Sequence, residues 1–295
     1  MHDHDDEAYL RSLGYGQQLF REMGGFSNFA ISFSIISVLT GAVLLFGYGL
    51  KFAGPIVNSV GWPLVSLFTL AVAASMAEIA SAYPTAGGLY FWSYRLGGRG
   101  WAWTTAWLNM IGQVTITAGI NIAAAIYLIG AATRIFGVES SGFTTTWSFQ
   151  LLVMVAIMIP QVVINIYGIR LTARLSDVSV WWHIAGVGVI VLLLALLGKH
   201  HNPAPFVFSF QASTDAYAAS SSLAIADFST PSPLFRMFPS LANFYRAAPP
   251  ALLFVLALLQ AQWTYTGYDA SAHVAEETVM ARKNSAWGIF LSVAV

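Results

Sequence analysis

Two Thr-Gly pairs lie inside stretches of the chain that are otherwise apolar. Thr40-Gly41 lies within SVLTGAVLLFGYGL, and Thr266-Gly267 lies within TYTGYDASAHVAEET. Unwound backbone inside a membrane survives only where its free polar groups line a cavity, and there its N–H groups suit an anion and its carbonyls a cation. The pairs therefore indicate reversible binding of a small charged solute. The alternative is that both glycines only allow close helix packing.

Three ionisable side chains lie within or beside predicted membrane segments, where such groups are functional candidates by default. Asp269 follows the second Thr-Gly pair, His183 lies in VWWHIAG, and Glu78 lies near the end of another apolar stretch. An unperturbed histidine titrates near neutral pH, which suits proton coupling. The alternatives are structural, because Asp269 can cap the following half-helix, His183 can hydrogen-bond, and Glu78 can reach the interface. These three residues are the candidates for coupling or gating.

The remaining polar residues of the apolar stretches favour hydrogen bonding between helices over solute binding. Four of them recur at every fourth residue and so share one side of a helix. Two more accompany a proline. These six residues are Asn109, Gln113, Thr117, Asn121, Gln161 and Asn165. At the end of the second Thr-Gly segment, His273, Glu276 and Glu277 fit a cytoplasmic gate or salt-bridge partners.

The composition shows what kind of elements carry these residues. The 295 residues are 57% hydrophobic and only 9% charged, whereas soluble domains carry about 25% charge. A soluble enzyme, a nucleic-acid-binding protein and a coiled coil are therefore excluded. The absence of cysteine excludes disulfides and thiolate chemistry. Stretches without Asp, Glu, Lys or Arg that exceed the roughly 20 residues of a membrane-spanning helix are 23–50, 52–77, 100–133, 140–169, 178–198 and 247–268.

These stretches divide the chain into four predicted regions. Residues 1–24 form a mostly solvated cytoplasmic tail, and residues 25–198 form transmembrane helices 1–5. Residues 199–248 form an outer loop rich in Ala, Ser and Pro, and residues 249–295 form helix 6 and a truncated helix 7. The greater number of Lys and Arg on one side favours a cytoplasmic N-terminus. The predicted helices are 26–50, 56–80, 101–133, 148–168, 178–198, 249–277 and one that starts at 286.

Three segments make the chain resemble a known family. GWPLVSLFTLAVAASMAEIASAYPTAGGLYFWSYRLGG (61–98) resembles the second helix and following loop of the amino acid–polyamine–organocation permeases. LLQAQWTYTGYDASAHVAEET (258–278) and FAISFSIISVLTGAVLLFGYGL (29–50) resemble the sixth and first helices of the amino acid/choline transporter branch, which includes fungal GABA and choline permeases. The resemblance covers nearly the whole chain. It departs in length, because the family continues beyond the helix in which this chain ends.

The resemblance implies an all-α polytopic membrane protein with the inverted-repeat (5+5) transporter fold, of which this chain holds the first repeat, helix 6 and a truncated helix 7. It implies a permease that moves an amino acid or related amine, such as GABA or choline, by alternating access. A proton is the expected coupling ion, and no catalysis, cofactor, metal or nucleic acid is expected. Choline would depend on aromatic faces, for which Trp263 is a further candidate. The implied substrate-binding residues are Thr40, Gly41, Ala42, Tyr265, Thr266, Gly267 and Tyr268.

Location and stability give three further expectations. The plasma membrane is the expected location, with the vacuolar or another membrane as the alternative. Gly112 and Gly188 are interpreted as packing glycines, whose replacement lowers stability. Because helix 7 is shorter than the roughly 20 residues of a spanning helix, the chain alone is expected to be unstable in a membrane and to transport nothing.

Two other classes of membrane protein fit parts of the sequence. A seven-helix receptor fits the number of helices, but it requires the opposite orientation of the N-terminus. Tyr268-Asp269 resembles one half of an intramembrane aspartyl protease site, but the chain contains no Gly-x-Gly-Asp partner sequence. We expect neither class.

Overall fold

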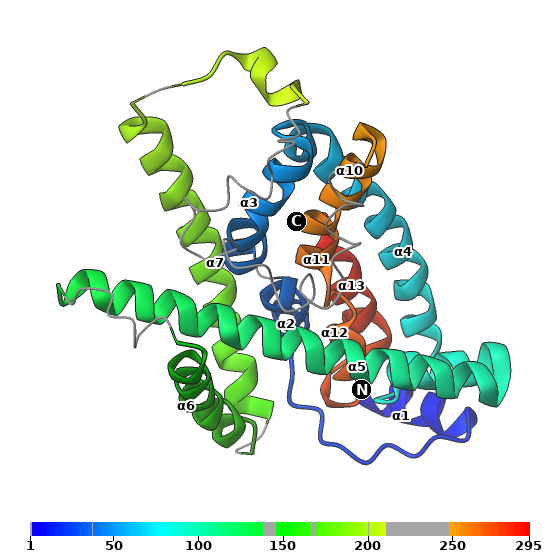
Figure 1. Ribbon diagram of the computed structural model, residues 1–295. Helices are drawn as coiled ribbons and strands as arrows, with labels where there is room; N and C mark the ends of the chain where they lie inside the picture. Colours follow the sequence, from blue (N-terminus) through cyan, green and yellow to red (C-terminus); the bar gives the residue numbers. More distant parts are fainter. Residues whose placement is uncertain (1, 37, 138–145, 167–168, 200, 211–247) are drawn as a thin grey trace. The chain divides into compact units, whose positions relative to one another are not determined.

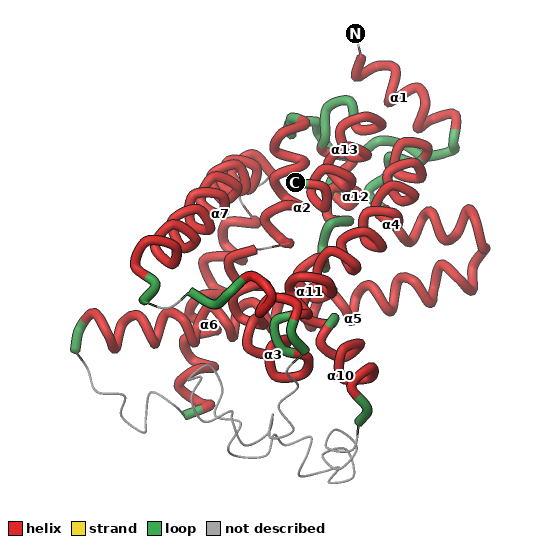
Figure 2. The backbone as a smooth tube through the Cα atoms, turned by 90° about the horizontal axis from the view of Figure 1, so that it is seen from above, coloured by secondary structure: helices red, strands yellow, loops and turns green. Residues whose placement is uncertain are grey.

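The computed structural model describes residues 2–36, 38–137, 146–166, 169–199, 201–210 and 248–295, which form helices joined by loops (Figure 1, Figure 2). These residues contain no β-strand, only one isolated bridge between Met23 and Thr278. Most of the predicted outer loop lies outside the described residues. The described helices that are long and apolar enough to span a membrane are Val57–Ala82, Gly88–Ile135, Trp147–Ile166 and Arg170–Leu197. The chain is an all-α polytopic membrane protein, as the sequence predicts.

Large apolar side chains cover the outside of the spanning helices. In α6 (Trp147–Ile166), Leu152, Ile159 and Ile166 are 65%, 61% and 75% exposed, and the helix has no buried residue. Exposure to water would cost about 25 cal/mol for each Å² of apolar surface. A helix that is apolar on every side is stable only in a core or in lipid.

The described residues form two compact units, and three helices contribute to both. The first unit consists of 1–35, 73–180 and 268–295. Within it, α5 packs along α6 and α12 packs against α13. Its elements are α1 (His2–Ser12), α2 (Gly25–Ile36), the end of α4 (Trp62–Ala82), α5 (Gly88–Ile135), α6, the start of α7 (Ile169–Leu197), α12 (Ala270–His273), η5 (Ala275–Glu277) and α13 (Ala281–Ala294).

The second unit consists of 36–72 and 181–267. Within it, α10 and α11 both pack against α3, and α11 also contacts η1. The unit therefore pairs the second part of predicted helix 1 with the first part of predicted helix 6. Its elements are η1 (Val38–Ala42), α3 (Val43–Ala53), η2 (Val57–Gly61), the start of α4, the end of α7, η3 (Ala204–Phe208), α10 (Pro250–Ala257) and α11 (Leu259–Tyr265).

Predicted helices 1 and 2 both contain a π-helical turn. In helix 1, the turn η1 covers the Thr-Gly pair, so the helix is wider there rather than fully unwound. In helix 2, the turn η2 follows Gly54 and Pro55. Gly54 ends α3 with φ +76°, and its N–H donates to Leu50 O at 2.9 Å. Single π-helical turns are frequent at functional positions, because they change which side chains face inward.

The segment that follows α4 becomes helical at Gly88. It forms the first part of α5, which starts at Gly88. Gly98 interrupts the helix with φ +79°, a conformation that few other residues adopt without strain. The bend at this glycine separates the aromatic segment before it from the spanning segment after it (Figure 2).

The N-terminal tail, predicted to be mostly solvated, also packs against the rest of the first unit. The tail contains α1, and Leu10 and Met23 are fully buried. Asp6 is 7% exposed, and its carboxylate lies 3.2 Å from the Arg21 guanidinium. Charged residues are buried only when paired, and composition alone does not show that these two residues meet.

Helix 7 begins earlier than predicted. α13 starts at Ala281, five residues before 286, and it includes Arg282 and Lys283. These two charges obscured the start of the helix in the hydropathy pattern. Met280 precedes it with φ +52°, so the chain turns sharply at that residue.

Candidate functional site

Helix 6 is broken at the second Thr-Gly pair. α11 ends at Tyr265, Thr266 is extended with φ −60° and ψ +131°, and α12 starts at Ala270. Gly267 has φ +101°, which a side chain disfavours, and it is buried. The backbone groups at this break lack their usual helical partners. Thr266 N–H still donates to Trp263 O at 3.2 Å, but the break places the backbone of Gly267 outside both helices.

Helix 1 closely approaches helix 6 at Gly41. A methyl group added there would lie 3.0 Å from Thr264 Oγ1 and 3.2 Å from Thr264 Cα. Such distances are tighter than ordinary contacts, and the second atom belongs to the backbone. The structure thus supports the packing interpretation of Gly41, because its Cα faces helix 6.

A buried polar cluster lies one turn before this contact, and the sequence analysis missed it. Gln260 is 1% exposed, and its Nε2 donates to Asn58 Oδ1 of η2 at 3.0 Å. Its Oε1 is buried without a hydrogen-bond partner and lies against Gly49, where any side chain would overlap it. Thr264 Oγ1 donates to Gln260 O at 2.9 Å. A glutamine within an otherwise apolar helix is the signal that could have identified this cluster.

Tyr265, a predicted substrate-binding residue, is held by two residues of α4. Its hydroxyl lies 2.7 Å from Ser66 Oγ, and its ring centroid lies 6.4 Å from that of Trp62. The side chain is half-buried, as is that of Trp263. Thr266 is exposed, and its hydroxyl donates to Gln262 O at 3.2 Å. The tyrosine is therefore fixed, whereas the threonine side chain lies at the surface.

In the first unit, a hydrogen-bond network joins α2 to the start of the second part of helix 6. Ser32 Oγ donates to Tyr268 O at 2.9 Å and lies 2.7 Å from Ser271 Oγ. Asn28 Nδ2 donates to Ser271 O and to Thr278 Oγ1 at 3.1 and 2.9 Å. Asn28, Ser32 and Ser271 are all fully buried. Because this network satisfies backbone groups near the break, it fixes the start of α12.

Asp269 does not cap α12, although it occupies the N-cap position. Its side chain makes no capping hydrogen bond, and Oδ2 instead lies 3.4 Å from His273 Nε2. The capping interpretation is therefore wrong, and the aspartate and histidine form a pair one turn apart. The other two coupling candidates lie elsewhere: His183 is half-buried on α7, and Glu78 is exposed on α4.

The N-terminal tail covers the C-terminal end of predicted helix 6. Glu22 and Met23 N–H groups donate to Glu277 O at 3.0 and 2.9 Å, and Arg21 donates to Thr278 O at 2.9 Å. Glu276 is 3% exposed. Burial, and next a hydrogen bond to this carboxylate, raises the pKa of Tyr15 to about 12.

The polar residues of α5 and α6 make hydrogen bonds within their own helices. Asn121 Nδ2 donates to Thr117 O, and Asn165 Nδ2 donates to Gln161 O, both at 2.9 Å. Hydrogen bonds between helices were predicted for this set, whereas these two bonds each lie within one helix. The packing interpretation of two glycines is also not supported, because a methyl at Gly112 or Gly188 meets no described atom within 4 Å.

The structure places the predicted substrate-binding residues in two groups. Gly41, Ala42, Tyr265, Thr266 and Gly267 belong to the second unit, and Tyr268 to the first. The side chain of Thr40 lies outside the described part. Free backbone groups, fixed hydroxyls and an aromatic ring suit a small polar solute. They supply neither an activated nucleophile nor an acid–base pair aimed at a bond.

Known proteins that are similar to this chain include amino acid permeases. A family model described as "Amino acid permease" matches residues 23–295. "Amino-acid permease BAT1" of Arabidopsis thaliana is 36% identical over 298 residues, or 98% of this chain and 52% of that protein. Its homolog in Oryza sativa subsp. japonica is 36% identical over 98% of this chain and 51% of its own length. "Thiamine transporter thi9" of Schizosaccharomyces pombe is 25% identical over 98% and 49%. The chain spans about half the length of these curated relatives, and no solved structure matches it significantly.

Proposed function

Because the chain belongs to the amino acid permease family, we propose that it forms part of a secondary active transporter for an amino acid or a related amine. The family match confirms the resemblance to amino acid–polyamine–organocation permeases that the motifs indicated. Membership of a permease family also favours a transporter over a receptor or a protease, and it indicates a transporter rather than an enzyme.

The observation that supports this proposal is the break in helix 6 beside helix 1. A zwitterion that leaves water must exchange its hydration for fixed dipoles, because unpaired charge in a low-dielectric site is very unfavourable. The backbone at Thr266 and Gly267 provides such dipoles. We assign the solute to this break and to the adjoining turn. The residues assigned are Thr40, Gly41, Ala42, Tyr265, Thr266, Gly267 and Tyr268.

The regions of the chain follow from this assignment. Residues 25–198 form the first repeat of an inverted-repeat transporter, and 249–295 form helix 6 and part of helix 7. Residues 1–24 lie in the cytoplasm and 199–248 on the outer side. The plasma membrane is the proposed location, and the whole protein works by alternating access.

Proton coupling is the proposed source of energy, with Asp269, His183 and Glu78 as candidate groups. The Asp269–His273 pair is the strongest of these, because two titratable side chains 3.4 Å apart can share and release a proton. If Asp269 carries the proton, Asp269→Asn flattens the pH dependence of uptake. His183→Gln and Glu78→Gln provide the matched comparisons, and the variant that flattens the dependence identifies the group.

The transport proposal is tested by uptake into vesicles that contain the full-length protein. The solutes are radiolabelled amino acids, GABA, choline and thiamine, because the relatives include permeases of different stated substrates. We expect saturable, pH-dependent uptake of at least one amine. Tyr265→Phe, which removes the hydroxyl bonded to Ser66, should weaken uptake, whereas Tyr94→Phe, on the exposed part of α5, should not. Absence of uptake for the whole panel would contradict the proposal.

A further inference from the structure

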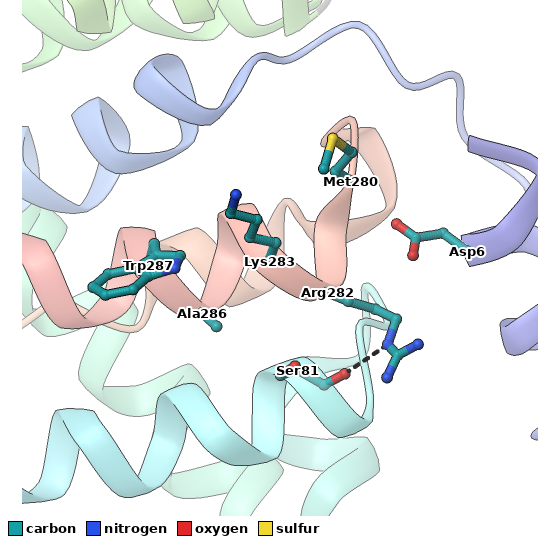
Figure 3. A pocket seen from close by; sticks show the side chains of 7 residues that line it. All are labelled: Asp6, Ser81, Met280, Arg282, Lys283, Ala286 and Trp287. Carbon is teal, nitrogen blue, oxygen red and sulfur yellow. Dashed lines mark hydrogen bonds between the residues drawn. The ribbon is translucent and has the colours of Figure 1, made fainter. Parts of the chain in front are cut away.

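A pocket of about 410 Å³ lies in the first unit, between α1, the end of α4 and the start of α13 (Figure 3). Asp6 contributes to it from α1 and Ser81 from α4. Arg282, Lys283 and Trp287 contribute from α13. The pocket contains charges of both signs and shares no residue with the proposed solute site. Neither the family nor the relatives assign it a ligand.

The guanidinium of Arg282 is held in a fixed position beside this pocket. Its Nε donates to Ser81 O at 3.3 Å, and its Cζ lies 4.1 Å from the centre of the Tyr9 ring. Tyr9 is fixed in turn, because its hydroxyl donates to Ala82 O at 3.1 Å. A stacked, planar guanidinium retains donors for a second partner and loses little freedom on binding. Such a group is well suited to a phosphate.

The pocket lies beside the end of a candidate membrane span and is lined by residue types common among lipid headgroups. The spanning helix that contains α4 ends at Ala82, one residue after Ser81. Lys283 and Trp287 lie one turn apart on α13, and Trp287 is 52% exposed. Tryptophan and lysine are typical of the interface, where the ring lies among the headgroups and the ammonium reaches the phosphates.

The carboxylate of Asp6 disfavours a ligand whose only charged group is a phosphate. Its carboxylate faces the pocket across from Arg282 (Figure 3), and it also pairs with Arg21 at 3.2 Å. A second anion close to this carboxylate would be repelled, whereas an ammonium group on the same ligand would be attracted. We propose that the pocket binds the headgroup of an aminophospholipid, with its phosphate at Arg282 and Lys283 and its ammonium at Asp6.

This binding would also hold the N-terminal tail in place. Two of the residues involved, Asp6 and Tyr9, belong to α1, so the complete pocket exists only while α1 is docked. A bound lipid therefore stabilises the docked tail by mass action, because it binds that state alone. The proposal does not depend on transport, so it can fail or succeed separately from the proposed function.

The test measures lipid binding to the delipidated, full-length protein in detergent by native mass spectrometry. Lys283→Gln is expected to lower the affinity for phosphatidylethanolamine about fivefold, which corresponds to the ~1 kcal/mol that a basic residue contributes near anionic headgroups. Arg174→Gln, which removes an exposed arginine of α7, is the matched control and should leave the affinity unchanged. Equal losses in both variants, or none in Lys283→Gln, would overturn the proposal.

Two ligand comparisons on the unmodified protein test the chemistry without any risk to folding. Phosphatidylcholine carries the same phosphate, but its quaternary ammonium has no N–H to donate to Asp6, so it should bind several-fold more weakly. Equal binding of the two lipids would overturn the role of Asp6. Soluble glycerophosphoethanolamine should compete only weakly. Competition at the concentration of the lipid would support the phosphate-and-ammonium chemistry but overturn a lipid as its source.

Protection of the tail provides an independent readout. Limited proteolysis within residues 13–20 should slow when phosphatidylethanolamine is added to the unmodified protein. The slowing should be absent in Lys283→Gln and retained in Arg174→Gln. A tail that is cleaved at the same rate with and without lipid would contradict the coupling between the pocket and α1.

Discussion

Replacing Gly267 by alanine tests whether the break in helix 6 depends on the conformation of this residue. Gly267 has φ +101°. A side chain in so unfavourable a conformation costs about 1–3 kcal/mol. Alanine also favours a continuous helix by ~1 kcal/mol over glycine. Together the two effects shift the equilibrium from the broken towards the continuous helix by about 2–4 kcal/mol, which is roughly 30- to 1,000-fold.

Hydrogen exchange over residues 264–274 measures this shift directly. In the unmodified protein, the amides of Gly267, Tyr268 and Asp269 should exchange quickly, because they lie between α11 and α12 rather than inside a helix. In Gly267→Ala they should be slowed, and affinity for the transported solute should fall while the protein still reaches the membrane. Gly112→Ala is the control, since Gly112 is helical and a methyl group there meets no described atom within 4 Å.

Two results would refute this reasoning. If exchange and solute affinity in Gly267→Ala match those of the unmodified protein, the positive φ does not maintain the break. If Gly112→Ala changes exchange at 264–274 as much as Gly267→Ala does, the effect is a general loss of stability. Gly41→Val should also weaken solute binding, but through its contact with Thr264 rather than through backbone conformation.

Three further predictions follow from contacts near the two ends of helix 6. Arg21→Gln should destabilise the docked tail by about 3–5 kcal/mol, as loss of one member of a buried ion pair does. Arg11→Gln, which changes a side chain that is 72% exposed, should cost under ~1 kcal/mol, and the protease cleavage rates of the tail compare the two variants. The pKa of Tyr15 is raised to about 12, so the stability that its neutral phenol contributes should be fully present below pH ~10 and lost as the pH rises to about 12. A difference absorbance titration of the unmodified protein against Tyr15→Phe measures this pKa, and a midpoint near that of free tyrosine would refute the prediction. Gly49→Ala should lower the thermal stability of the protein, because the added methyl group forces Gln260 to move. The double variant Gly49→Ala, Gln260→Ala should recover part of the loss, and a double variant no more stable than Gly49→Ala would contradict the contact.

The spanning helices were predictable from the sequence because their signal is local. A run of about 20 residues without charge is stable in lipid as a helix whatever it later contacts. The predicted helices at 148–168 and 178–198 correspond to parts of α6 and α7. The break in helix 6 was also visible, because Thr266-Gly267 is followed by Asp269 in an otherwise apolar segment.

Polar contacts between distant segments were not predictable. Gln260 and Asn58 are 202 residues apart, and Arg21 and Thr278 are 257 residues apart. No local pattern indicates that such residues meet. The same limitation led to the wrong capping role for Asp269, since the choice between a cap and His273 depends on side-chain geometry.

By itself, the sequence determined that the chain is helical and that it lies in a membrane, and it indicated Thr266-Gly267 as a candidate break in helix 6. Each of these depends on the transfer free energy and conformational preferences of residues that are close along the chain. Only the tertiary structure decided that Gly41 faces Thr264, that Asp6 pairs with Arg21, and that Arg282 is held beside Asp6 in a pocket. These contacts depend on which distant groups are buried together. A buried charge or polar group is stable only next to the partner that the fold brings to it.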